Sequence, residues 1–98
     1  MLVDFKSLNK NSRVWVFQSV TLIDNYIVET IKEKLTLFLS EWKSHQNNVK
    51  SSFEIISNTF IIIGVDDNNL VSGCSIDSLV NFVKEIENTH DLQLLDKF

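Results

Sequence analysis

The sequence predicts an α+β domain of the ferredoxin-like class, in which an antiparallel sheet carries two helices on one face. First, 98 residues suffice for one domain. Second, the expected elements follow the order β-α-β-β-α, with an ambiguous segment at 92–95 as either a last strand or a fragment of something longer. Third, the first and third strands are apolar on both faces and the second alternates, as two central strands and one edge strand would. We assign residues 1–12 to an N-terminal arm and 13–98 to a single α+β domain.

The first strand and the first helix have clear local signals. Residues 13–18 are rich in β-branched and aromatic side chains, which favours a strand. Asp24 is the expected N-cap of the next helix, and Ile23 can then pack on Val28 as a hydrophobic staple. The helix should end near residue 43. Its apolar stripe has the 3-4-3-4 spacing of an amphipathic helix: Val28, Ile31, Leu35, Phe38 and Trp42.

A hairpin and a second helix follow. The mainly polar stretch 44–50 predicts a loop, and 52–55 alternate polar and apolar side chains, which indicates a strand with one solvent-exposed face. Ser57 and Asn58 form a short turn before the almost wholly apolar strand at 59–65. Ser75 or a neighbour is expected to cap the second helix. That helix has its own apolar stripe: Ile76, Leu79, Val80, Val83 and Ile86.

Two helices can cover only one face of such a sheet, so the other face needs a cover. Left bare, it would be an apolar patch on the order of several hundred Å², more than soluble monomers usually expose. The N-terminal arm, a second copy of the chain or a further C-terminal segment are the available covers. The pattern leaves open which alternate set of side chains faces outward. The candidate interface anchors are Trp15, Phe17, Ile61 and Ile63.

The predicted topology also gathers polar residues at one edge of the sheet. They are Arg13, His45, Asp66, Asp67, Cys74, Ser75 and Asp77. Cys74 lies near the start of the second helix, where the helix dipole favours a thiolate, and His45 is a possible base for it. Asp77, in the first helical turn, would oppose the thiolate. The alternatives are structural, with Cys74 as a small buried residue, His45 as a helix C-cap and Asp77 as a first-turn carboxylate. Arg13, Asp66 and Ser75 are the candidate binding edge, and no catalytic residue is assigned.

The sequence offers no recognisable metal or cofactor site. One cysteine and two histidines do not form a tetrahedral zinc set, and the Asp-Asp-Asn-Asn run at 66–69 lacks the ligand spacing of an EF-hand. We therefore expect no metal and no cofactor.

Composition limits the classes of partner and compartment. The net charge of −4 argues against nucleic acid or an anionic membrane surface as partners. No run of about 18 apolar residues is present, and the start lacks the pattern of a secretory signal. A single cysteine fits a reducing compartment, so we expect a cytoplasmic protein. Abundant Asn, Ile and Lys with no Pro or Ala indicate an AT-rich genome.

Several stretches resemble a small bacterial protein family whose members often carry the label "ABC transporter ATPase". They are Arg13–Ser19, Trp42 to His45, Ser52–Ile55, Phe60–Asp66 and, most specifically, the Ser-Gly-Cys-Ser-Ile-Asp-Ser run at 72–78. Family members typically have Trp-Thr-Ala-His at the second stretch and continue further, so this chain looks C-terminally short. An ATPase requires a Gly-rich loop ending in Lys-Ser/Thr, and neither glycine here precedes such a pair. We therefore expect no ATPase activity.

The function expected from these observations is a non-enzymatic cytosolic interaction module. It would bind itself or a protein partner through the apolar sheet face. The alternative is a thiol-dependent enzyme or a small-molecule site built from Cys74, His45 and Asp77.

Overall fold

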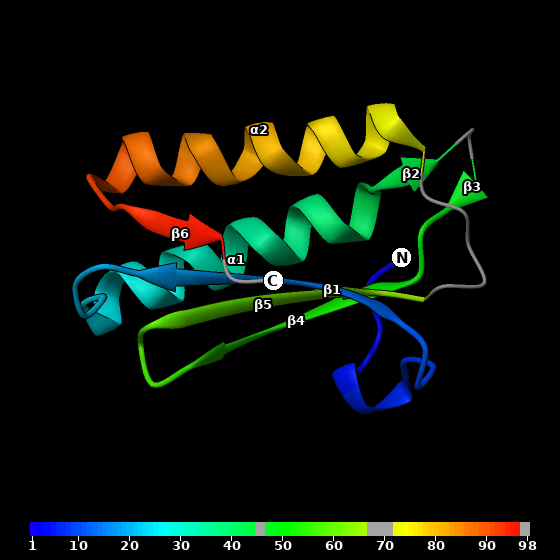
Figure 1. Cartoon of the computed structure of the whole chain (residues 1–98), viewed down its shortest axis with the longest axis horizontal. Helices are drawn as coiled ribbons and strands as arrows, with labels where there is room; N and C mark the ends of the chain where they lie inside the picture. The colour runs from blue at the N-terminus through cyan, green and yellow to red at the C-terminus, as the bar shows by residue number, and fades with distance from the viewer. Residues whose placement is uncertain (45–46, 67–71, 97–98) are drawn as a thin grey trace.

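The computed structural model describes residues 1–44, 47–66 and 72–96, which fold as an antiparallel sheet with two helices on one face (Figure 1). The elements in chain order are the 3₁₀ turn η1 (Phe5–Ser7), β1 (Arg13–Ser19), α1 (Asn25–Glu41), β2 (Lys43–Ser44), β3 (Asn47–Asn48), β4 (Ser51–Ile56), β5 (Phe60–Val65), α2 (Gly73–His90) and β6 (Leu94–Asp96). The main sheet has the order β4-β5-β1-β6, so β1 and β5 are central. The prediction of a ferredoxin-like α+β arrangement is confirmed.

The core lies on the sheet face that the helices cover. The four residues predicted as interface anchors belong to this core, so that prediction is wrong. Trp15 lies opposite Ile63 in the β1–β5 register and Phe17 lies opposite Ile61. All four side chains are buried in the cluster that α1 and α2 complete, so they cannot contact a partner. Since successive strand residues point to opposite faces, the neighbouring set must face away from the helices. That set is Val14, Val16, Phe60 and Ile62.

The start of α1 is held by the turn of the β4–β5 hairpin. Ile23 is buried and donates its N–H to the Asn58 carbonyl oxygen at 2.8 Å. The Asn58 side-chain amide donates back to the Ile23 carbonyl oxygen at 3.0 Å. Ser57 and Asn58 have φ values of 55° and 51°, the positive values that the two central residues of a type I′ turn need, and the Thr59 N–H closes this turn on the Ile56 carbonyl oxygen at 3.0 Å. Asp24 occupies the predicted N-cap position, although its side chain makes no capping bond.

The boundaries of two other segments differ from prediction. α1 ends at Glu41, slightly before residue 43, because Trp42 is extended and Lys43 enters the two-stranded ladder of β2 and β3. α2 is capped by Ser72, whose hydroxyl accepts the Ser75 N–H at 3.2 Å. The ambiguous last segment forms β6, paired with β1.

The N-terminal arm lies over one end of the open face, which is the sheet face that the helices do not cover. The arm is one of the three covers that the sequence analysis expected. It passes along the edge strand β4, where the Val3 N–H donates to the Ser51 carbonyl oxygen at 2.8 Å. Phe5 and Leu8 then lie over Gly64. A Cβ added to Gly64 would stand 2.7 Å from Leu8 Cδ1, so the missing side chain permits this close approach. Figure 1 shows the arm beneath the sheet, on the side away from the helices.

Neither α1 nor α2 combines the length and the apolar character that a bilayer span needs, among the residues the structure describes.

Candidate functional site

Two rows of side chains on the open face lie beyond the end that the arm covers. We call them the open sheet end: Val16, Gln18, Glu54, Ile56, Phe60, Ile62 and Leu95. Val16 and Ile62 are direct cross-strand partners at its centre and are half-buried. Ile56, on the edge strand, is 43% exposed. Since Glu54 is its only ionisable member, this surface is largely apolar.

At the edge where β1 starts and β5 ends, Ser75 has a structural role. The Trp42 indole N–H donates to the Ser75 carbonyl oxygen at 3.1 Å. The Ser75 hydroxyl, within 2.9 Å of the Ser72 hydroxyl, donates to the Lys43 carbonyl oxygen at 2.7 Å. Ser75 is buried, so it joins the end of α1 to the start of α2 and does not face a ligand.

Arg13 and Asp66 lie at the same edge, and each has a partner within the fold. The Arg13 guanidinium carbon lies 4.8 Å from the centre of the Trp15 ring, a cation–π arrangement. Asp66 is buried, its N–H donates to the Lys50 carbonyl oxygen at 2.9 Å, and its carboxylate lies 3.9 Å from Lys50 Nζ. These contacts give the two residues structural roles.

The structure places Cys74 and Asp77 on the surface of α2. Cys74 is exposed, so the alternative that it fills a buried turn is wrong. Asp77 is exposed and lies beyond the first turn, because α2 begins at Gly73. The first-turn role proposed for its carboxylate is therefore also wrong. His45 and Asp67 lie outside the described residues.

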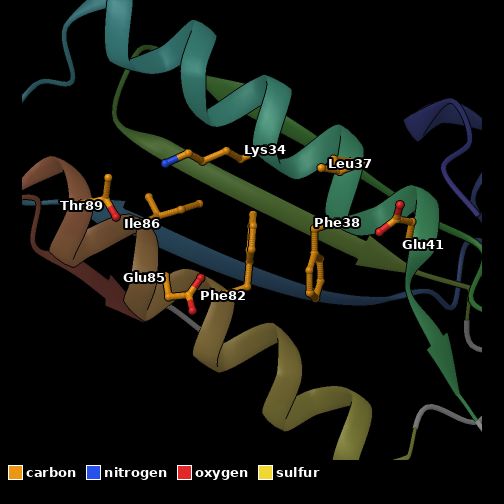
Figure 2. Close-up of a pocket in the computed structure, with 8 residues that line it drawn as sticks. All are labelled: Lys34, Leu37, Phe38, Glu41, Phe82, Glu85, Ile86 and Thr89. Carbon is orange, nitrogen blue, oxygen red and sulfur yellow. The ribbon is translucent and has the colours of Figure 1, made fainter.

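A feature that sequence reasoning missed is a groove of about 320 Å³ between α1 and α2 (Figure 2). It is lined by Lys34, Leu37, Phe38, Glu41, Phe82, Glu85, Ile86 and Thr89. Phe38 and Phe82 stack with ring centres 4.4 Å apart. Phe38 also meets Trp42 at 5.8 Å, so the aromatic contacts run from the groove into the core. The available signal was Leu37, an apolar residue adjacent to the predicted stripe.

At one end of this groove, Lys34 meets His90. Lys34 Nζ lies 3.1 Å from His90 Nε2. A lysine ammonium can only donate, so a hydrogen bond between them requires an unprotonated Nε2. Desolvation by burial, followed by the nearby Lys34 charge, lowers the pKa of His90 from its ordinary value of about 6.5.

The lowered pKa of His90 predicts a pH-dependent contribution to stability. Because the pKa of His90 is lower in the folded state, the contribution is complete above about pH 6.5 and is lost as the pH falls through the folded pKa. We expect wild type to lose more stability than His90→Gln between about pH 7.5 and about pH 5 in urea unfolding. A ring-proton NMR titration of His90 with a midpoint at or above about 6.5 would contradict this.

Among the described residues, no group of three His, Cys, Asp or Glu side chains is placed to hold a metal ion. No protein-family model matches the chain. No curated protein is significantly similar to it. No solved structure matches it either.

Proposed function

We propose that this protein is a non-enzymatic interaction module that binds a second copy of itself, or another protein, through the open sheet end. The observation that carries the proposal is the apolar pair Val16 and Ile62, on the sheet face that neither α1 nor α2 covers. The arm, through Phe5 and Leu8, contacts the Gly64 end of that face. Two rows of side chains remain for a partner.

The chemistry of this surface fits a protein partner. Removing apolar area from water is the main favourable term in association, and interface cores are depleted of charged residues. At the open sheet end, Ile56 and Leu95 flank the half-buried central pair. Glu54 lies on the edge strand, where a rim charge keeps its contact with water.

The structural roles of the edge residues support a non-enzymatic function. Ser75 forms hydrogen bonds between the helices, and Arg13 lies on the Trp15 ring.

The negative net charge supports a protein partner over nucleic acid or a membrane, and the single cysteine supports a cytoplasmic location. The residues quoted above support the proposal that the protein belongs to the bacterial family that it resembles.

The test is the molar mass in solution across a dilution series, by size exclusion with light scattering. Wild type should exceed the monomer mass of 11.3 kDa at high concentration and approach it on dilution. The double variant Val16→Thr/Ile62→Thr keeps the β-branched shape but adds hydroxyl groups to the apolar surface. We expect it to shift association to about tenfold higher concentration.

Val80→Thr is the matched control, because Val80 is exposed on α2 and belongs to the opposite layer. It should associate as wild type does. A Val16→Thr/Ile62→Thr variant that is folded by circular dichroism and associates as wild type does would exclude the open sheet end as the self-association surface.

A further inference from the structure

The groove between α1 and α2 has a charge at each end of its α1 side. Figure 2 shows Lys34 near one end and Glu41 at the other, with Leu37 and Phe38 between them. The two residues are seven positions apart on the helix, about 10 Å along its axis, which is too far for a direct ion pair. Among the described residues, the ion pairs are Lys32–Glu29 and Lys50–Asp66, so Lys34 and Glu41 form no ion pair there. Lys34 Nζ contacts the neutral His90 ring, which leaves its charge without a carboxylate partner in that part of the chain.

The order of these two charges along α1 allows two copies of the helix to pair with each other. When two copies of α1 lie antiparallel with a two-fold axis between the levels of Leu37 and Phe38, Lys34 of each copy is level with Glu41 of the other. Leu37 is likewise level with the other copy's Phe38. A two-fold interface makes each such contact twice. The single arrangement therefore forms two opposite-charge pairs around an apolar centre.

The groove also offers a matching shape. Leu37 is 63% exposed on its α1 rim, a position where an isolated monomer leaves a large apolar side chain in water. The stacked Phe38 and Phe82 rings form an apolar lining next to it. In the antiparallel arrangement, Leu37 of each copy reaches the groove of the other, as a side chain of one helix enters a hole in the facing one.

We propose that this groove is a homodimer interface, occupied by the antiparallel α1 of a second copy. The interface lies on the helix layer and does not depend on the proposed function, which uses the opposite side of the sheet (Figure 1). A dimer of this kind leaves the open sheet end of each copy available to a partner.

The test is a charge-exchange experiment by sedimentation equilibrium, run in wild type and in the Val16→Thr/Ile62→Thr background. In the dimer, Lys34→Glu replaces both opposite-charge pairs with Glu–Glu pairs. Glu41→Lys replaces both with Lys–Lys pairs. We expect each to weaken dimerisation about tenfold or more at low salt. An equimolar mixture of the two variants restores both opposite-charge pairs, so it should dimerise as wild type does. The double variant Lys34→Glu/Glu41→Lys should do the same, which also shows that neither substitution disrupts folding.

A second pair of variants tests the apolar centre. In the Val16→Thr/Ile62→Thr background, Leu37→Ser should abolish the dimerisation that remains. Leu22→Ser removes an even more exposed leucine, at 73%, outside the groove and should have no effect. Single charge variants that dimerise normally, or a mixture that fails to restore the dimer, would overturn the proposal. The proposal would also be overturned if the substitutions in the open sheet end changed the molar mass and the substitutions in the groove did not. That result would still agree with the proposed function.

Discussion

Replacing Trp42 with alanine is expected to lower the free energy of unfolding by about 3–5 kcal/mol, the usual cost of truncating a buried tryptophan. Trp42 is 4% exposed and lies where α1 leaves the core. Its ring meets Trp15 edge to face at 6.5 Å and Phe38 at 5.8 Å. Domains of this size have a total stability of about 5–15 kcal/mol, so the loss should be readily measured by urea unfolding followed by circular dichroism.

Trp42→Phe separates the hydrogen bond from the packing. Phenylalanine keeps an aromatic ring against Trp15 and Phe38 but cannot donate to the Ser75 carbonyl oxygen. Losing a partner for a buried polar group costs about 1–3 kcal/mol, so this variant should fall between wild type and Trp42→Ala. A loss below about 1 kcal/mol for Trp42→Ala would show that the joint between α1 and α2 does not depend on this residue.

The order of the strands was predictable because each has its own local pattern, but the side of the sheet that the helices cover was not. Val14 and Val16 alternate with Trp15 and Phe17, and both sets are apolar, so a period of two cannot select between them. The structure shows the larger aromatic side chains under the helices, where they fill more of the core. On the other face Gly64 admits Leu8 of the arm, a contact between residues remote in sequence.

For the candidate site at the sheet edge, sequence reasoning could predict which residues lie near one another but not what each residue does. Topology correctly places the start of β1, the end of β5 and the start of α2 together. The role of Ser75 depends on a hydrogen bond to Lys43, thirty-two positions away, which no local pattern contains. The groove was missed for a similar reason. Phe38 and Phe82 belong to different helices, and each one alone resembles an ordinary stripe residue.

The pair Ile63→Ala and Ile62→Ala tests the assignment of the two sheet faces directly. The two residues are neighbours in β5 with the same side chain and opposite directions. Ile63 is 0% exposed and packs under the helices, so its truncation should cost about 2–5 kcal/mol. Ile62 is half-buried on the open face, and its truncation should cost about 1 kcal/mol or less.

The two variants should also separate in association. Ile62→Ala removes apolar area from the open sheet end, so it should weaken self-association with little loss of stability. Ile63→Ala should destabilise the fold while the molecules that remain folded associate as wild type does. Equilibrium urea unfolding and light scattering on the same samples give both quantities. If Ile62→Ala were the more destabilising of the two, the open face would be covered more extensively than by the arm alone, and no room would remain there for a partner.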